Sequence, residues 1–355
     1  MGRLRAIDLF AGAGGLTVGL KQAGINVIEA IEIDIDASET YKYNHPEVKV
    51  NTTDITKIPD EYFIQLKNKG INIVTGCPPC QGFSSLTMKK DDPRNKLVYE
   101  FLRAIKIIEP QAVMMENVPG MAKRGKEIFD DVLNQLAQMG YYTSYKVLQV
   151  ADFGVPQSRN RLVMYASKAK KIEMPSTTHA EKGENGKLKW LTVKDAFENI
   201  TIPTPLTIRQ VSENAIENMN HWSIIRELAP INKERLKYIK SGSNRYSIPD
   251  ELRPPCHKGK NKGYGNVYAR MDWDKPSPTI TTGCTTMSTG RFIHPEEDRT
   301  ISVREAAILQ TFPIGYTFKT RYLERACRLV GNALPCKFAE ALSKHLVNEL
   351  NSSTA

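Results

Sequence analysis

The first 170 residues alternate short apolar runs with longer amphipathic stretches, and this alternation limits the fold more than any other feature of the chain. The apolar runs are nearly continuous, as strands buried in a parallel sheet usually are. Alternation of such strands with helices is typical of βαβ units. The pattern therefore predicts an α/β fold with a parallel sheet, in which some of the later strands can be antiparallel. The predicted strands are Leu4–Phe10, Val27–Ile33, Ile71–Thr75, Ala112–Met115, Tyr145–Val150 and Leu162–Ala166.

Helices are predicted between and after these strands. Lys96–Glu109 places apolar residues on one helical stripe and stops at Pro110, and Lys126–Met139 does the same before Gly140. Both segments are predicted crossover helices. Phe338–Leu350 carries apolar residues at helical spacing near the C-terminus.

The length of 355 residues exceeds the roughly 250 to 300 residues at which single cores tend to split, so we expect two domains. A polar stretch with weak periodicity, dotted with glycine and proline, runs from about Lys168 to Thr300 and predicts a second, irregular domain. The predicted boundaries are residues 1–170 for the first domain, 171–300 for the second, and 301–355 for a C-terminal segment that returns to the first.

Composition excludes several classes of protein. A net charge of +10 is compatible with a polyanionic partner, although it is also an ordinary route to solubility. No apolar stretch approaches the ~18 to 20 residues of a membrane span, and the first ten residues lack the apolar core of a secretion signal. Six cysteines are sparse for a disulfide-stapled secreted domain, so we expect reduced thiols and a cytoplasmic protein.

The first strand leads into a glycine-rich turn, Phe10-Ala11-Gly12-Ala13-Gly14-Gly15, which opens a predicted helix. Such a turn lets a ligand approach the backbone closely. Glu32 ends the second strand, where an acid can accept hydrogen bonds from ribose hydroxyls. Thr17 stands where a dinucleotide site needs its third glycine, which favours a single nucleoside such as S-adenosylmethionine over NAD or FAD. A tight turn without a ligand explains the glycines equally well.

A second loop, from Gly76 to Ser84, follows strand Ile71–Thr75 and contains Cys77 and Cys80. It projects from the carboxyl edge of the sheet beside the glycine turn. A zinc site would need more ligands than the sequence groups together. The prolines favour a rigid loop over the helix that a thioredoxin-like pair opens, but spacing alone leaves a redox pair open.

Short motifs along the chain together resemble the DNA (cytosine-5) methyltransferases of the bacterial restriction-modification type. They are Asp8-Leu9-Phe10-Ala11-Gly12-x-Gly14-Gly15, Pro79-Cys80-Gln81 with Phe83-Ser84, Glu116-Asn117-Val118, Gln157-x-Arg159-x-Arg161, Arg304-Glu305 and Gly331-Asn332. Only about Lys168–Pro278 is unmatched, where that family carries its variable target-recognition domain. The resemblance implies an α/β, Rossmann-like S-adenosylmethionine-dependent methyltransferase domain with a mixed sheet, and a smaller, irregular target-recognition domain.

The resemblance also implies which residues carry the reaction. Cys80 matches the nucleophile that adds to C6 of cytosine, and Glu116 matches the acid that assists as charge develops on the ring. Arg159 and Arg161 match the pair that steadies the flipped cytosine and a nearby phosphate, although exposed arginines are usually just solvated. No residue clearly matches the base that removes the C5 proton. Cys77 departs from the glycine common in the family and makes a Cys77–Cys80 disulfide conceivable.

For the cofactor, the motifs imply contacts from Phe10, Gly12, Gly14, Glu32, Asp54, Ile55, Pro79, Leu97 and Asn332. Asp54 suits the adenine amino group, although by itself it would be a helix cap. Asn332 implies that the last helix packs beside the first strand. We expect no metal.

The implied substrate is duplex DNA, from which the target nucleotide must swing out at a cost of a few kcal/mol that phosphate contacts offset. The second domain must therefore hold DNA. Between Arg253 and Arg270 the chain carries basic residues and tyrosines but no acid, which is typical of a groove-facing loop and also of a solvated one. The predicted DNA-binding residues are Gln81, Ser84, Arg253, Lys258, Lys260, Lys262, Arg270 and Thr279.

Alternative functions stay open at this point: an RNA (tRNA) cytosine-5 methyltransferase, an inactive DNA-binding relative, and a thiol oxidoreductase that uses Cys77 and Cys80. The size of the variable domain favours duplex DNA, and intact Cys80 and Glu116 favour an active enzyme. Biological role rests on analogy. We expect a nucleoid-associated modification enzyme that acts as a monomer, away from membranes, with a cognate restriction endonuclease as a functional rather than a physical partner.

Overall fold

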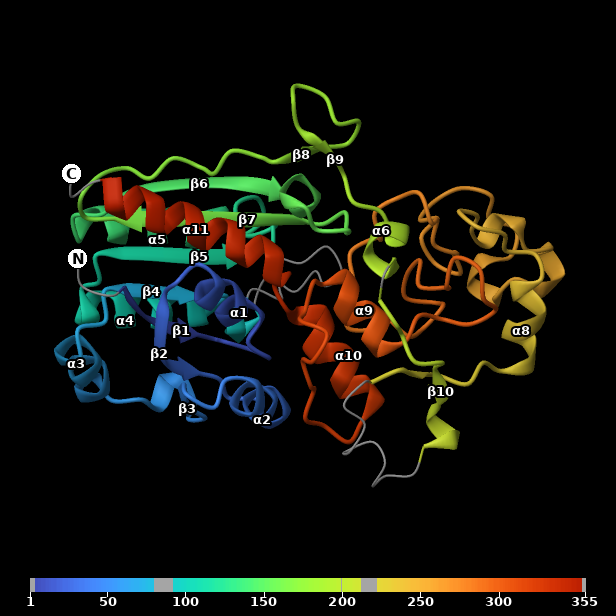
Figure 1. Ribbon diagram of the computed structural model, residues 1–355, viewed down its shortest axis with the longest axis horizontal. Coiled ribbons are helices and arrows are strands. Elements are labelled where there is room, and N and C mark those ends of the chain that lie inside the picture. Colours follow the sequence, from blue (N-terminus) through green and yellow to red (C-terminus); the bar gives the residue numbers. More distant parts are fainter. Residues whose placement is uncertain (1–3, 80–91, 199, 212–221, 353–355) are drawn as a thin grey trace. The chain divides into compact units, whose positions relative to one another are not determined.

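The computed structural model describes residues 4–79, 92–198, 200–211 and 222–352 (Figure 1). The chain divides into two compact units. The first comprises Met1–Phe153, Asn160–Thr178 and Leu334–Ala355, and the second comprises Gly154–Arg159 and His179–Ala333. Of the C-terminal segment 301–355, residues 301–333 therefore lie in the second unit and residues 334–355 lie in the first. The functions predicted for the domains stay predictions.

A seven-stranded mixed sheet forms the centre of the first unit, in the order β3-β2-β1-β4-β5-β7-β6. The first five strands are parallel to their neighbours, and β7 is antiparallel to both β5 and β6. The predicted α/β class with a mixed sheet is confirmed. The strands are β1 (Arg5–Leu9), β2 (Asn26–Ile31), β3 (Lys49–Asn51), β4 (Ile73–Gly76), β5 (Ala112–Asn117), β6 (Tyr142–Gln149) and β7 (Asn160–Ser167).

Helices cover both faces of this sheet (Figure 1). They are α1 (Gly15–Gln22), α2 (Ile35–Asn44), α3 (Asp60–Asn68), α4 (Leu97–Ile108), α5 (Lys126–Gln138) and α11 (Cys336–Ser352). The 3₁₀ turns are Ile55–Lys57, Pro93–Lys96 and Val150–Phe153. The helical periodicity thus located α4 and α5 to within two residues at each end.

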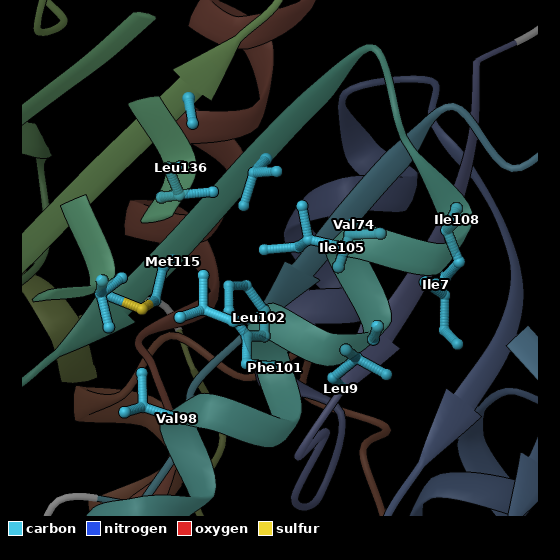
Figure 2. Packing of buried hydrophobic residues seen from close by; sticks show 14 of the residues in the cluster. Ile7, Leu9, Val74, Val98, Phe101, Leu102, Ile105, Ile108, Met115 and Leu136 are labelled. Carbon is cyan, nitrogen blue, oxygen red and sulfur yellow. The ribbon is translucent and has the colours of Figure 1, made fainter. Parts of the chain in front are cut away.

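Side chains of β1 alternate between the two faces, as the pleat of a strand requires. Ile7 and Leu9 belong to the apolar cluster that also contains Phe101 and Ile105 of α4 (Figure 2). Asp8 lies on the opposite face, where it accepts a hydrogen bond from the Thr17 hydroxyl of α1 at 2.7 Å. The sheet is therefore buried on both faces, and ligands can reach it only at its edges or at the strand ends.

The last helix, α11, packs against α1. The sequence predicted this helix beside the first strand, but the structure places it on the helix that follows that strand. Gly19 of α1 lies at the contact: a Cβ there would be 2.3 Å from Glu340 N and 2.4 Å from Ala339 C. These are backbone atoms of α11, so the two helices touch where only glycine fits.

Gly19→Ala is expected to lower the free energy of unfolding by about 1 to 3 kcal/mol, because overpacking outweighs the better helix propensity of alanine. Urea denaturation would measure the change. Gly315→Ala is the control, since a Cβ at Gly315 meets no atom of the described residues within 4 Å. This substitution should change stability by less than about 0.5 kcal/mol. Equal stability of the Gly19 variant and the wild type would contradict the packing described here.

The second unit consists of short elements joined by long loops. Its helices and strands are β8 (His179–Ala180), β9 (Leu188–Lys189), α6 (Val193–Phe197), β10 (Leu206–Thr207), β11 (Ile224–Ile225), α8 (Pro230–Leu236), α9 (Val303–Leu309) and α10 (Leu323–Asn332). Its 3₁₀ turns are Ile208–Gln210, Arg245–Ser247, Asp250–Leu252 and Pro255–His257. Among the described residues, no helix of either unit could span a membrane.

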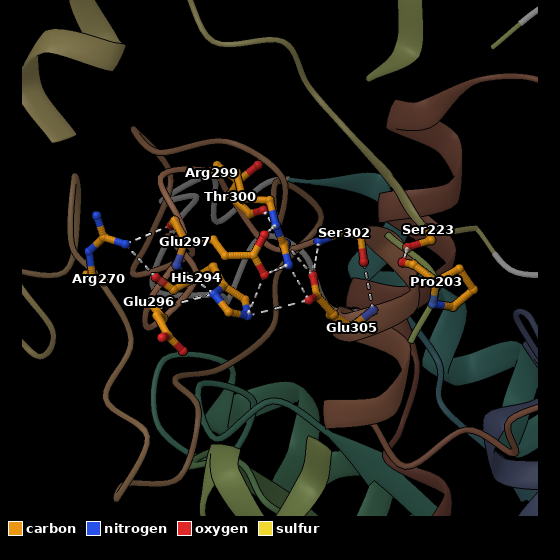
Figure 3. A network of polar contacts seen from close by, with 10 residues as sticks. All are labelled: Pro203, Ser223, Arg270, His294, Glu296, Glu297, Arg299, Thr300, Ser302 and Glu305. Carbon is orange, nitrogen blue, oxygen red and sulfur yellow. Dashed lines mark hydrogen bonds and ion pairs between the residues drawn. The ribbon is translucent and has the colours of Figure 1, made fainter. Parts of the chain in front are cut away.

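A buried polar network organises part of this unit (Figure 3). The Glu305 carboxylate of α9 accepts two hydrogen bonds of 2.8 Å from Arg299 and one of 2.6 Å from the Ser302 amide. Arg270 donates to the carbonyls of His294, at 3.0 Å, and Glu297, at 2.7 Å. Charged hydrogen bonds therefore fix a segment that has little regular secondary structure.

Candidate active site

Glu116 and Arg161 lie side by side at the end of two antiparallel strands. Glu116 of β5 pairs in register with Val163 of β7, two residues after Arg161. Arg161 Nε is 2.7 Å from Glu116 Oε1, and the two side chains are only 13% and 11% exposed. Desolvation lowers the pKa of Arg161, whereas the Glu116 carboxylate raises it. The pair places an acid, held by a guanidinium, near the carboxyl end of β5, where the sequence predicted it.

The loop after β4 begins beside this pair. Asn117 Nδ2 donates to the carbonyl of Pro78 at 2.9 Å, which ties the loop to the end of β5. Burial raises the pKa of the Cys77 thiol well above its usual value, and the nearby carboxylates of Glu116 and Asp8 raise it further. Cys77 is therefore a protonated, weakly nucleophilic thiol.

Three predicted site residues of this loop, Cys80, Gln81 and Ser84, lie outside the described residues. Their roles, and a disulfide between Cys77 and Cys80, stay predictions. Pro79 is the last described residue before this stretch and is partly buried.

The glycine turn and Glu32 form one structure at the ends of β1 and β2. Glu32 accepts hydrogen bonds from the amides of Gly12 and Asp34, each at 2.7 Å, and burial raises the pKa of this carboxyl. Gly12 and Gly14 adopt positive φ angles of 56° and 88°, and among the described residues no atom lies within 4 Å of a Cβ built at Gly12. The described part of the chain therefore leaves space for a ligand at this turn.

These residues fit a nucleoside that carries an amino-acid tail. Within the part of the chain that the structure describes, no side chain caps α1 at Gly14, so its N-terminus can receive a carboxylate. The sequence predicts Glu32 as the acid for ribose hydroxyls. Asp54 Oδ1 accepts hydrogen bonds from the Thr56 amide at 3.0 Å and hydroxyl at 2.9 Å. These bonds lower the pKa of Asp54 and keep it an ionised acceptor.

Three other predicted cofactor residues lie in the first unit. Ile55 is buried, while Phe10 and Leu97 are partly buried and pack against the apolar cluster of α4. Asn332 ends α10 in the second unit and is exposed, and its cofactor contact stays a prediction.

Two residues near the turn were missed by the sequence analysis. Ile33, directly after Glu32, is 60% exposed, although apolar residues at strand ends are usually covered. An apolar residue directly after a carboxylate at a strand end was the available signal for an exposed apolar surface. Asp8 is fully buried, and burial raises its pKa to about 7. A carboxyl inside an apolar strand was a signal for a buried polar contact.

Arg159 has different neighbours from Arg161. Its guanidinium is buried in the second unit, where it donates to the carbonyls of Ile280 at 2.8 Å and Gly331 at 3.3 Å. Gln157 Oε1 accepts from the Ile280 amide at 3.1 Å. The motif residues Gln157 and Arg159 thus hold the segment that contains Thr279, whose hydroxyl donates to the Ser158 carbonyl at 3.0 Å.

The predicted DNA-binding residues fall into two groups. Lys258, Lys260 and Lys262 are exposed, as is Tyr264, at 63%. Arg253 is buried and donates to the carbonyls of Ile248 at 2.8 Å and Tyr246 at 3.0 Å, while Arg270 is buried in the network of Figure 3. The lysines can meet a phosphate directly, whereas the two arginines bind the chain's own carbonyls.

The mixed sheet, with its glycine turn and paired Glu116 and Arg161, is the architecture of an S-adenosylmethionine-dependent methyltransferase of the cytosine C5 type. The chain belongs to the C-5 cytosine-specific DNA methylase family, whose model matches residues 4–348. This confirms the enzyme class that the ordered motifs predicted.

Individual relatives resemble the chain over most of its length. A type II methylase, M.HgiDII of Herpetosiphon aurantiacus, is 36% identical over 96% of this chain and 94% of its own length. A type II methyltransferase, M1.HphI of Haemophilus parahaemolyticus, is 32% identical over 96% of this chain and 86% of its own length. A crystal structure described as a DNA modification methyltransferase encoded within an E. coli prophage matches with a TM-score of 0.73 and 25% identity, over 98% of this chain and 99% of that one.

Proposed function

We propose that the protein transfers a methyl group from S-adenosylmethionine to C5 of a flipped-out cytosine in a short duplex DNA sequence, as the modification enzyme of a type II restriction-modification system. The observation that carries this proposal is the buried Glu116–Arg161 pair beside the loop that leads to Cys80. The similarity to M.HgiDII and M1.HphI, both type II enzymes by name, supports the biological role.

The chemistry assigns a separate task to each residue. Cys80 adds as a thiolate to C6 of cytosine, which forms the S–C6 bond and moves the π electrons of the ring toward C5 and N3. In its protonated form, the Glu116 carboxyl donates its proton toward N3 as this charge develops, and Arg161 holds the carboxyl in place. When bound, S-adenosylmethionine would supply an electrophilic methyl group, which C5 accepts. The C5 proton then leaves, the S–C6 bond breaks to release the Cys80 thiolate, and the N3 proton returns to Glu116, which restores the aromatic ring.

For the cofactor, we propose that the amides around Gly12 and Gly14 bind the methionine carboxylate and that Glu32 binds the ribose. Asp54 accepts from the adenine amino group, and the exposed Ile33 contacts a face of the base. Phe10, Ile55, Pro79, Leu97 and Asn332 complete the proposed set. The support comes from the open space at Gly12, the two amides that orient Glu32, and the ionised state of Asp54.

For the substrate, we propose that the exposed lysines at 258, 260 and 262 contact phosphates, with Gln81, Ser84 and Thr279 closer to the target base. Arg253 and Arg270 support this surface from inside the unit, in place of the direct DNA contact that the sequence predicts. Arg159 likewise holds the Thr279 segment. In this proposal the enzyme acts as a monomer on double-stranded DNA at the nucleoid, with a cognate endonuclease as its functional partner, and residues 171–300 carry target recognition.

Base-resolution mapping of 5-methylcytosine in a methylation-free host that expresses the protein tests this function. We expect methylated cytosines in one short sequence context, because a fixed recognition surface admits few target sequences. An unmodified genome from a well-expressed, folded protein would refute the DNA activity. Incorporation of labelled methyl groups into tRNA in that case would establish the RNA alternative.

A further inference from the structure

Arg103 of α4 joins three elements of the first unit. Its Nη2 donates to the carbonyls of Ile55 at 2.8 Å and Ile58 at 3.0 Å. Its Nη1 contacts Asp60 at 2.6 Å, and its Nε contacts Glu100 at 2.8 Å. One guanidinium thus connects α4, the 3₁₀ turn Ile55–Lys57 and the first residue of α3.

The two carbonyls bound by Arg103 lie at either end of the turn that Asp54 begins. The Asp54 side chain caps this turn through the Thr56 amide and hydroxyl. Among the described residues, both of these contacts use Oδ1, which leaves Oδ2 of the same carboxylate for a ligand. The orientation of Oδ2 therefore depends on the backbone of the turn. Arg103 fixes that backbone through its hydrogen bonds to the Ile55 and Ile58 carbonyls.

The surroundings of Arg103 make its contacts with the carbonyls rigid. The side chain is only 26% exposed, and its guanidinium lies over the buried Phe63 ring, 5.0 Å from the centroid. A planar guanidinium can stack on a ring and donate in several fixed directions at once, whereas a lysine ammonium cannot. The contact with Asp60, which is 60% exposed, is the one most open to solvent and contributes least to this rigidity.

We propose that Arg103 is a positioning residue for recognition of the adenine ring: it holds the Ile55–Ile58 turn so that the Asp54 carboxylate can accept a hydrogen bond from the adenine amino group. The same side chain fixes the position of this turn relative to α4, which begins at Leu97. The inference deepens the proposed function, since it rests on S-adenosylmethionine as the cofactor.

The test uses the whole chain and two ligands that differ in the base. S-adenosylhomocysteine carries the adenine amino group, and S-inosylhomocysteine has a carbonyl oxygen in its place and a hydrogen on N1. Isothermal titration calorimetry gives the dissociation constant of each for the wild type, for Arg103→Met, which keeps an apolar side chain on Phe63, and for Arg103→Lys. Asp60→Asn is the control, because it removes only the exposed contact of Arg103.

We expect the wild type to prefer the amino-bearing ligand by about tenfold or more, as one good hydrogen bond to a charged acceptor allows. Arg103→Met should reduce this preference to within about threefold and raise the KM for S-adenosylmethionine about tenfold, with kcat at saturating cofactor and the KM for DNA within about twofold of wild type. Arg103→Lys should fall between the two, and Asp60→Asn should match the wild type.

The outcomes separate the two proposals. If the wild type binds neither ligand, the cofactor assignment fails. If the wild type discriminates between the ligands and Arg103→Met discriminates equally well, the positioning role is refuted, even if that variant melts at a lower temperature. Loss of thermal stability alone would identify Arg103 as a purely structural residue.

Discussion

Cys80→Ala is expected to reduce the rate of DNA methylation by at least about a thousandfold, because it removes the proposed nucleophile outright. C5 of cytosine is too weakly nucleophilic to take a methyl group unless a thiolate first adds to C6. Binding of cognate DNA should stay within a few fold of wild type, since phosphate contacts supply most of the affinity. Single-turnover methylation with labelled cofactor, together with a gel-shift assay, measures both quantities.

Cys77→Ala is the matched control, and it separates methyl transfer from thiol redox chemistry. Burial and the neighbouring carboxylates keep the Cys77 thiol protonated, so its removal should leave the rate within about threefold of wild type. A duplex with 5-fluorocytosine at the target adds an independent measure, because fluorine at C5 cannot leave as a proton and the protein stays bonded to C6. Equal loss of activity in the two alanine variants would contradict Cys80 as the sole nucleophile and favour a dithiol mechanism.

The fold could be predicted where a segment is both long and strongly periodic. Lys96–Glu109 and Lys126–Met139 were predicted as helices, and α4 and α5 occupy almost the same residues because their apolar stripes pack on the sheet. The strand β3 was missed because it has only three residues, none of them buried. The sequence also gives no sign that α11 packs on α1, since that contact depends on the absence of a side chain at Gly19.

The candidate site was predictable where a motif coincides with a strand end. Glu116 is the second-last residue of β5 and Arg161 is the second residue of the neighbouring antiparallel strand β7, so the sheet brings their side chains together. The burial of Arg270 could not be predicted from a motif or a strand end. Its partners include the carbonyl of Ile239, 31 residues away in a region without regular structure, and no periodicity reports such a contact. Charge composition alone therefore could not show that this arginine donates to carbonyls of its own unit, and its contact with DNA stays a prediction.

Glu116→Gln is expected to lower kcat by about 10² to 10⁴, the usual contribution of a positioned general acid. The substitution keeps the shape of the side chain and replaces the carboxyl group by an amide, which neither ionises nor transfers a proton. It also leaves Arg161 buried without a counter-charge, which can cost about 3 to 5 kcal/mol of stability. Single-turnover rates must therefore be measured at a temperature where circular dichroism shows both proteins to be folded.

Two further variants determine whether the loss is chemical or structural. Glu109→Gln makes the same substitution in an exposed ion pair with Lys67 and should leave kcat unchanged. Glu116→Asp keeps the charge that Arg161 needs but withdraws the carboxyl by one methylene, so it should retain stability and still lose at least about tenfold in kcat. Because Arg161 is paired with Glu116 and is proposed to act only through it, Arg161→Lys combined with Glu116→Gln should cost little more than Glu116→Gln alone. If the two losses are fully additive, the residues contribute independently, and Arg161 would have a function other than holding the acid.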